Sequence, residues 1–236
     1  MTKEAGIRAK KFYESFVKKV ELVSSPEVAE LSKLLENTYR FLNISFVNQF
    51  HDYCLKLGIN SIEVIEAAAT KSFGFQPFYP GAGIGGHCIP VDSAYLRSGA
   101  DEVNFDFSLV RQCEVLNENR YRTKADLFVE TLKSRDLFSS RVLLYGVTYK
   151  KGVPDTRESP AMAMIHLLRN RGLDVEWYDP LVDEFMNTPR SSLDSKFGSM
   201  LVLIDNPSDA FTRLLSEIDL VVDMSISLYK KGVIHI

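Results

Sequence analysis

Residues 141–179 read RVLLYGVTYKKGVPDTRESPAMAMIHLLRNRGLDVEWYD, and the order of patterns inside this stretch decides the fold class. RVLLYGV is a continuous apolar run, which is typical of a strand buried on both faces of a parallel sheet. Ser159 and Pro160 then mark the start of a helix, and Arg171 with Gly172 mark its end before DVEWYD supplies a second strand. The stretch therefore predicts a βαβ unit.

Three further apolar runs, MLVLID, DLVVDM and GVIHI, follow this unit toward the C-terminus. Strands that alternate with helical stretches favour a parallel α/β architecture. We therefore predict that residues 137–236 form a small parallel α/β domain.

A long helical pattern lies upstream, over residues 27–57, and ends at Gly58. Ser24, with Glu27 three residues later, fits a capping box, and Pro26 lies in the first turn. Such a helix would be about 45 Å long. Its apolar surface exceeds what packing on one neighbour requires, so we predict a homodimer through this helix. The apolar residues are Leu31, Leu34, Leu35, Leu42, Phe46 and Phe50.

The helical patterns continue over residues 25–136 and predict an all-α central domain. Asn60 with Glu63 caps a second, shorter helix. After an irregular stretch, residues 105–134 return to a helical pattern.

The first 24 residues read as a remnant of a preceding domain. Residues 3–19 have a helical pattern, and VELVS at 20–24 is a short strand candidate. A helix and one strand cannot form a core. We expect this segment to be mobile, repacked or paired with another chain, because its strand has no sheet partners here.

Composition and charge exclude several classes of protein. The 236 residues carry a formal net charge of −3 with both signs mixed, so no basic face attracts nucleic acid. No apolar run approaches the roughly 18 to 20 residues that span a bilayer, and no signal peptide is visible, so we expect a cytoplasmic protein. Three cysteines at distant positions argue against a disulfide framework and against a metal site.

GAGIGG at 81–86 matches the dinucleotide-binding pattern GxGxxG, but its context differs. The prolines of the preceding FQPFYP do not suit a central strand, and Pro90 follows soon after, so we reject that reading. Glycines that remove obstructing side chains favour a loop that binds a ligand closely, whereas the alternative is a flexible connector. Flanking aromatic residues favour an ordered loop, and they could stack on a base or sugar: Phe73, Phe75, Phe78 and Tyr79.

Cys88 ends this loop beside His87, with Asp92 four residues later. A lone cysteine is more often a small buried apolar residue than a nucleophile, and that reading suits Cys54 and Cys113, which lie in helical patterns. A cysteine hydrolase that uses Cys88 and His87 is an alternative, although adjacent side chains tend to diverge.

Three segments together resemble the UDP-glucose/GDP-mannose dehydrogenase family. PGAGIGGHCIPVDSAYL at 80–96 is similar to the family's active-site segment, EVAELSKLLENTYRFLNISFVNQF at 27–50 to its central helix, and GVTYKKGVPDTRESPAM at 146–162 to the start of its C-terminal domain. The resemblance implies a central dimerisation domain at 25–136 and a Rossmann-like UDP-sugar-binding domain at 137–236. It also implies that the family's N-terminal NAD-binding domain lies outside this sequence.

The resemblance implies an activity: oxidation of a sugar carbon-6 alcohol to a carboxylate with two NAD. Cys88 would attack the aldehyde and form a thiohemiacetal and then a thioester. Lys33 and Asn37, on one helix face, would stabilise the substrate oxygen, although without the resemblance they read as a solvated pair on a helix surface. Asp92 would assist proton transfer or hydrolysis.

Contacts to substrate and cofactor are also implied. Arg157 would reach the phosphates of NAD. Substrate contacts would come from the loop and the C-terminal domain: Tyr79, Gly81, Gly83, Gly85, Gly86 and Lys150. The string ATKSFGFQPFYPGAGIGGHCIPVD is most similar to family members that act on UDP-N-acetylhexosamines, whose products feed surface polysaccharide synthesis. This chain alone would be inactive without the NAD domain, which a separate chain could supply, and a non-catalytic binding or dimerisation module is the alternative.

The sequence departs from the family in two places. Met224, Ser225 and Ile226 follow Asp223 where an arginine is common in the family, which puts a ligand contact there in doubt. Ala82 and Ser93 replace prolines that are usual in the family loop, and the replacements should loosen it.

Overall fold

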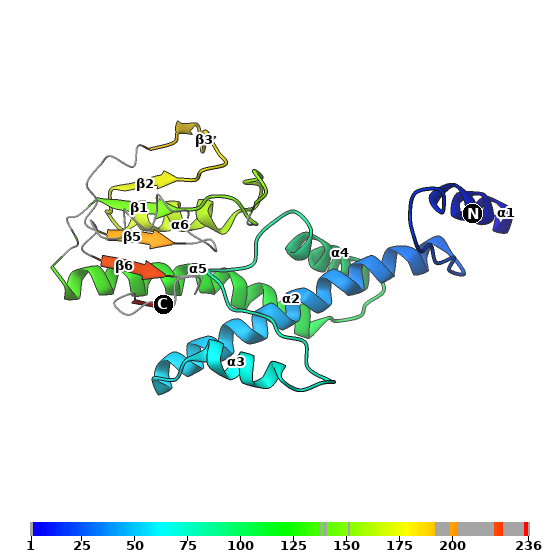
Figure 1. Ribbon diagram of the computed structural model, residues 1–236, viewed down its shortest axis with the longest axis horizontal. Helices are drawn as coiled ribbons and strands as arrows, with labels where there is room; N and C mark the ends of the chain where they lie inside the picture. Colours follow the sequence, from blue (N-terminus) through cyan, green and yellow to red (C-terminus); the bar gives the residue numbers. More distant parts are fainter. Residues whose placement is uncertain are drawn as a thin grey trace.

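The computed structural model describes most of the chain: residues 2–136, 138, 141–150, 152–191, 199–202, 220–223 and 234–235. Helices make up the first part of the chain, and a parallel sheet with its flanking helices makes up the second (Figure 1). None of the helices in the described ranges is both long and apolar enough to cross a membrane.

The N-terminal segment differs from its sequence prediction. Helix α1, Lys3–Tyr13, begins at Thr2, whose hydroxyl oxygen accepts a hydrogen bond from the Ala5 amide at 3.2 Å, and none of the residues of α1 is buried. The strand predicted at 20–24 is wrong, because these residues have no ladder partner and form irregular backbone. Helix α1 lies at the outer end of the long helix, away from the sheet (Figure 1).

The long helix α2, Pro26–Leu57, confirms the predicted element. Its N-cap is Ser25, whose side chain accepts from the Val28 amide at 3.4 Å, so the predicted cap at Ser24 is wrong by one residue. Gly58 ends the helix in the left-handed region, with a φ of 66°, where a residue with a side chain would be strained.

Three more helices pack around α2. Helix α3, Ser61–Ala69, is capped by Asn60 as predicted. Helix α4, Ile89–Glu102, was not predicted, and it packs along α2. Helix α5, Ser108–Ser134, begins three residues later than its predicted pattern.

The C-terminal part confirms the parallel α/β prediction. Strands β1, Val142–Tyr145, and β2, Val175–Tyr178, pair in parallel, and α6, Pro160–Asn170, connects them. Strands β5 (Ser199–Val202), β6 (Leu220–Asp223) and β7 (Ile234–His235) complete the sheet order β2-β1-β5-β6-β7, with every pairing parallel. A short hairpin, β3 (Glu184–Phe185) and β4 (Thr188–Pro189), follows β2.

Helix α5 belongs to both parts of the molecule. Its first half packs on α2 and α4, whereas Ala125, Phe128 and Leu132 in its second half are fully buried in the core that also contains α6 and the sheet. The core therefore continues through the helix that precedes the predicted domain boundary at 136–137, and that boundary stays a prediction. Loops packed on α5 are consequently held by a helix fixed at both ends.

Candidate functional site

Cys88 is an exposed thiol at the N-cap of α4, and its side chain makes no capping hydrogen bond. The other two cysteines, Cys54 and Cys113, are buried as predicted. Burial raises the pKa of the Cys113 thiol. Only Cys88 is therefore placed to meet a ligand from solvent.

Asp92 and Asn37 connect this helix start to α2. The Asp92 amide donates to the Cys88 carbonyl oxygen at 2.9 Å in the first turn of α4. The Asn37 side-chain amide donates to Asp92 Oδ2 at 2.5 Å, and Asn37 is only 1% exposed. Cys88 and Asp92 thus lie one helical turn apart on α4, and a side-chain hydrogen bond joins Asp92 to Asn37, 55 positions earlier in the chain.

Lys33 lies one turn before Asn37 on α2, and its side chain is exposed. Its ammonium group is 3.5 Å from Glu36 Oε2, a solvent-accessible pair. Such pairs contribute little to stability and separate easily. Lys33 is therefore an exposed cation one helical turn from Asn37, and its ion pair is with Glu36 and not with the Asn37–Asp92 contact.

The glycine loop ends at a helix without a strand before it. Residues 75–85 form irregular backbone, so the strand-turn-helix context of a dinucleotide fingerprint is lacking in this described segment. One of the arguments from the sequence was wrong, however. Pro90 lies in the first turn of α4, where a missing amide hydrogen has no cost.

Two glycines of the loop have different surroundings. A Cβ at Gly83 would lie 2.1 Å from Cε1 of Tyr121, so the glycine there permits contact with an aromatic ring of α5. A Cβ at Gly81 would meet nothing within 4 Å. Only the second of these matches the expectation that the glycines clear space for a ligand.

Gly85 and Gly86 bring the loop against the C-terminal part. A Cβ at Gly85 would lie 2.4 Å from the Glu158 carbonyl oxygen, and one at Gly86 would lie 2.6 Å from the Tyr149 ring. The Gly86 amide donates to the Glu158 carbonyl oxygen at 3.0 Å, and Gly86 has a φ of 88°. The space that Gly85 and Gly86 leave free is therefore filled by protein atoms and not by a ligand. These contacts join the Cys88 loop to the 149–160 segment.

Two buried cations of α5 and a partly exposed carboxylate of α2 lie beneath the loop. Arg120 donates through Nε to the Gly81 carbonyl oxygen at 2.7 Å and through a guanidinium nitrogen to Asp52 at 2.9 Å. Lys124 also donates to Asp52, at 2.9 Å. Partial burial acts to raise the pKa of Asp52, but the two cations outweigh it and lower that pKa. A cavity of about 140 Å³ adjoins the cluster.

Sequence reasoning missed this polar face of α5. Asn117, Arg120, Tyr121 and Lys124 follow the spacing i, i+3, i+4, i+7, so they share one helix face. The spacing of these polar residues can be read from the sequence, and it is the signal that could have identified this face. Asn48 of α2 completes the set, since its side-chain oxygen accepts from the Gly81 amide at 2.9 Å.

The 149–160 segment presents an ion pair beside Cys88. Arg157 donates to both carboxylate oxygens of Asp155, at distances of 2.6 to 3.1 Å. Hydrogen bonds from Arg157 lower the pKa of Asp155 to about 2, and the nearby His87 acts in the same direction. Arg157 is exposed, so a phosphate could share its guanidinium group, but in this structure the group is bound to a carboxylate. Lys150 is exposed nearby.

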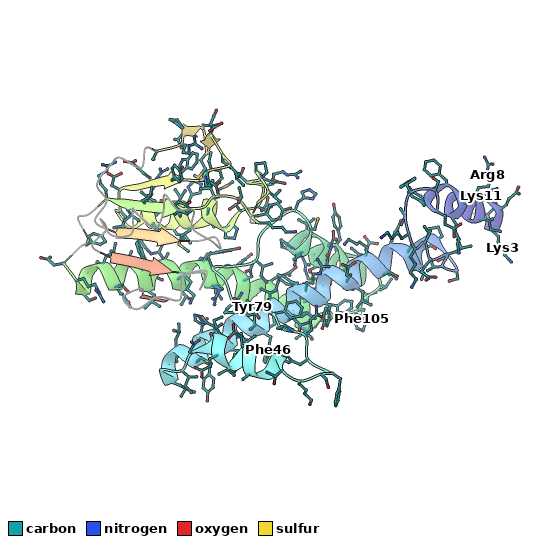
Figure 2. All side chains as sticks on the ribbon, in the orientation of Figure 1. Lys3, Arg8, Lys11, Phe46, Tyr79 and Phe105 are labelled. Carbon is teal, nitrogen blue, oxygen red and sulfur yellow. The ribbon has the colours of Figure 1, made fainter. Side chains whose placement is uncertain are left out.

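The aromatic stretch before the loop is ordered against α2. The Tyr39 hydroxyl donates to Gln76 Oε1 at 3.1 Å, and its ring contacts Phe78 edge to face at 5.9 Å. Tyr79 is 52% exposed and Phe46 is 68% exposed, and both lie on the central helical part (Figure 2). These contacts disfavour the flexible-connector reading of the segment.

Three further expectations concern the family prolines, the arginine after Asp223 and a metal site. Ser93 is fully buried and donates to the Ile89 carbonyl oxygen at 2.8 Å, and Ala82 is 4% exposed, so the positions expected to loosen the loop are packed. Positions 224–226, where an arginine was expected, lie outside the described residues. Among the described residues, no three His, Cys, Asp or Glu side chains are grouped to hold a metal ion.

Comparisons with known proteins cover both parts of the chain. Residues 27–119 match the central domain of the UDP-glucose/GDP-mannose dehydrogenase family, and residues 143–222 match the UDP binding domain of that family. A UDP-N-acetyl-D-mannosamine dehydrogenase of Pyrococcus horikoshii is 37% identical over 184 residues, which cover 77% of this chain and 43% of the relative. A UDP-N-acetyl-D-glucosamine 6-dehydrogenase of Pseudomonas aeruginosa is 34% identical over 161 residues, 67% of this chain and 38% of the relative.

Solved structures show the same likeness. The UDP-D-ManNAc dehydrogenase of Pyrococcus horikoshii superposes with a TM-score of 0.87 at 29% identity, over 99% of this chain and 57% of that one. The UDP-N-acetyl-mannosamine dehydrogenase of Staphylococcus aureus superposes with a TM-score of 0.79 at 28% identity, over 99% and 56%. The chain thus spans about half the length of the relatives it matches.

Proposed function

Because the chain belongs to the UDP-glucose/GDP-mannose dehydrogenase family through its central and UDP-binding domains, we propose that it handles the substrate of an NAD-dependent dehydrogenase. The reaction is the oxidation of carbon 6 of a UDP-N-acetylhexosamine to the carboxylate. The names of the matched relatives support the N-acetylhexosamine, and the resemblance supports a place in polysaccharide synthesis. The chain alone is proposed to be inactive, because its relatives are about twice as long.

One observation carries this proposal. An exposed cysteine, Cys88, lies at a helix start whose first-turn carboxylate, Asp92, is bound by the buried amide of Asn37. A lone exposed thiol carries little information by itself. A thiol with a carboxylate one turn away and an amide from another helix provides a nucleophile, a proton acceptor and a hydrogen-bond donor.

In the first oxidation the carbon-6 alcohol loses a hydride, and its hydroxyl proton passes to water, which gives the aldehyde. Cys88 Sγ then loses its proton to water and forms a bond with carbon 6 of that aldehyde. The carbonyl oxygen gains negative charge, and the Lys33 ammonium group is the cation proposed to stabilise it after leaving Glu36. NAD, when bound, supplies the acceptor for the hydride lost in each of the two oxidations. In the last step Asp92 accepts a proton from water, the water oxygen bonds to carbon 6, and the bond to sulfur breaks. The departing sulfur takes up the proton that Asp92 held, which restores the thiol.

Substrate contacts are proposed for exposed residues around the thiol. Tyr79 offers an exposed ring for stacking, and Gly81 has an open α-carbon face. Lys150 is exposed on the segment that packs on the loop, where its ammonium group suits a diphosphate. The other glycines can offer only their backbone, because their α-carbons face protein: Gly83, Gly85 and Gly86. Arg157 is the residue proposed to hold a cofactor phosphate, after exchange with Asp155.

A homodimer through α2 belongs to the same proposal. Leu31, Leu35, Tyr39, Phe46 and Tyr53 are between 46% and 68% exposed, and their spacing places them along one stripe of the helix. An exposed stripe of large apolar side chains is typical of an interface. The proposed domains are the remnant 1–24, the central domain 25–136 and the UDP-sugar-binding domain 137–236.

Calorimetry and an activity assay test the proposed function. We expect UDP-N-acetylglucosamine to bind more tightly than GDP-mannose, and NADH to form only after an N-terminal NAD-binding domain of a relative is added. Cys88→Ser should abolish sustained NADH formation without loss of nucleotide binding, because the second oxidation requires the thiol, whereas Ser98→Ala, an exposed position on the same helix, should change neither. Nucleotide binding with turnover that does not depend on Cys88 would contradict the proposal, and binding with no turnover would favour a non-catalytic module.

A further inference from the structure

Ile84, in the middle of the glycine loop, has both of its backbone polar groups bound by α5. Its amide donates to Asn117 Oδ1 at 2.8 Å, and its carbonyl oxygen accepts from Asn117 Nδ2 at 3.0 Å. The Tyr121 hydroxyl donates to the same carbonyl oxygen at 2.9 Å. One asparagine side chain thus pairs with the loop as a neighbouring strand would. The two peptide groups that flank Ile84 are therefore fixed in direction.

Tyr121 also shapes the loop through its ring. The ring occupies the space where Gly83 lacks a Cβ, so ring and hydroxyl hold two successive residues. Burial raises the pKa of Tyr121 to about 12, so the hydroxyl keeps its proton, and remains a hydrogen-bond donor, in alkaline as well as neutral solution. Asn117 and Tyr121 lie four residues apart, on one face of α5.

The contacts of Asn117 and Tyr121 with the loop are not the ones that fix the position of α5. Phe128 and Leu132 fix its second half in the sheet core, and Arg120 fixes its first half to Asp52 of α2. The Tyr121 hydroxyl and the Asn117 amide therefore act on the loop more than on the position of the helix. Four residues after Ile84 comes the exposed thiol of Cys88.

We propose that Asn117 and Tyr121 are positioning residues for Cys88. They fix the loop on the α5 side, the Gly86 amide fixes it on the side of the 149–160 segment, and together these contacts set where the thiol meets carbon 6 of a nucleotide sugar. Neither residue is assigned contact with the reacting atoms. The inference rests on the proposed function, since it names residues that serve the same thiol.

Ligand protection of Cys88 tests the positioning role. Asn117→Ala removes both contacts of one side chain, and Tyr121→Phe removes one hydroxyl while the ring stays. Asn119→Ala, an exposed asparagine on the same helix, is the matched control. The rate of Cys88 alkylation by iodoacetamide is measured by peptide mass spectrometry, with and without UDP-N-acetylglucosamine at saturation, in variants shown by thermal unfolding to be folded.

We expect the bound nucleotide sugar to slow alkylation of the wild-type thiol by about tenfold or more, and Asn117→Ala to lose about a factor of ten in that protection, the usual scale of one well-made hydrogen bond. Tyr121→Phe should lose a smaller factor, and Asn119→Ala should lose none. Wild-type protection in both folded variants would overturn the proposal. If Asn117→Ala does not fold, Tyr121→Phe decides the question.

A second measurement separates this inference from the proposed function. If UDP-N-acetylglucosamine leaves wild-type alkylation unchanged, the proposed function fails, because the thiol does not face the sugar. Exchange of the Ile84 amide hydrogen, followed by NMR, then tests by itself whether Asn117 holds the loop. We expect exchange about tenfold faster in Asn117→Ala than in Asn119→Ala, and equal rates would overturn the proposal.

Discussion

Lys124 is a buried amine whose removal should change how the stability of the protein depends on pH. Its side chain is 3% exposed, and its ammonium group is 2.9 Å from Asp52. Burial, and then repulsion from Arg120, lower the pKa of Lys124 from 10.5 to about 8, although Asp52 acts in the opposite direction. The folded protein therefore releases this proton at a lower pH than the unfolded chain does.

The sign and size of the effect follow from proton linkage. Below pH 8 the amine is protonated in both states, and the folded state carries the cost of the buried charge. Between pH 8 and pH 10.5 the unfolded chain holds a proton that the folded protein has released, so the free energy of unfolding rises with pH. For these two pKa values the rise from pH 7 to pH 9.5 is about 2 kcal/mol.

Lys124→Met should remove this rise, because methionine fills a similar volume and Asp52 keeps Arg120 as its partner. Urea unfolding at pH 7 and pH 9.5 measures the change for the wild type, for Lys124→Met and for the exposed control Lys56→Met. Other titrating groups contribute equally to all three proteins and cancel in the comparison. The same pH response in the wild type and in Lys124→Met would refute the account of a buried amine.

Three further predictions concern the loop and the exposed helix stripe. Iodoacetamide should modify Cys88 in the native protein, whereas the two buried cysteines should react only after unfolding. Peptide mass spectrometry measures the three alkylation rates, and equal rates in the native protein would contradict the burial of Cys54 and Cys113. Gly83→Ala should lower the free energy of unfolding by about 1–3 kcal/mol in urea titrations, because its Cβ would overlap an aromatic ring, whereas Gly81→Ala, with an open face, should stay within about 0.5 kcal/mol. Phe46→Glu should shift the mass measured by light scattering from dimer to monomer, and an unchanged mass would place the interface elsewhere.

Elements whose ends depend on local chemistry were predictable from the sequence. Gly58 and Asn60 bound their helices as predicted, and Ser159 with Pro160 begins α6. Helix α4 was missed because Pro90 was read as a helix breaker, although proline is tolerated in a first turn. The predicted strand at 20–24 failed for a different reason. A strand needs a partner, and this segment was already expected from the sequence to lack its sheet partners.

The sequence predicted the residues of the candidate site better than it predicted the contacts that hold them in place. The resemblance assigned both Asn37 and Asp92 to the catalytic site, and in the structure the Asn37 side-chain amide donates to Asp92. The reason for Gly83 was not predictable, because the ring that fills its space belongs to Tyr121, 38 positions later. Local patterns show that a glycine is present and leave open whether a ligand or the protein needs the space.

The central claim is that Cys88 carries the sugar as a thioester during oxidation. The Asp92→Asn variant, with the NAD-binding domain of a relative, NAD and UDP-N-acetylglucosamine, should accumulate that thioester, because hydrolysis lacks its proton acceptor. Mass spectrometry should find the oxidised nucleotide sugar bound to the Cys88 peptide and released by hydroxylamine. Formation of NADH with an unmodified Cys88 peptide would contradict the claim.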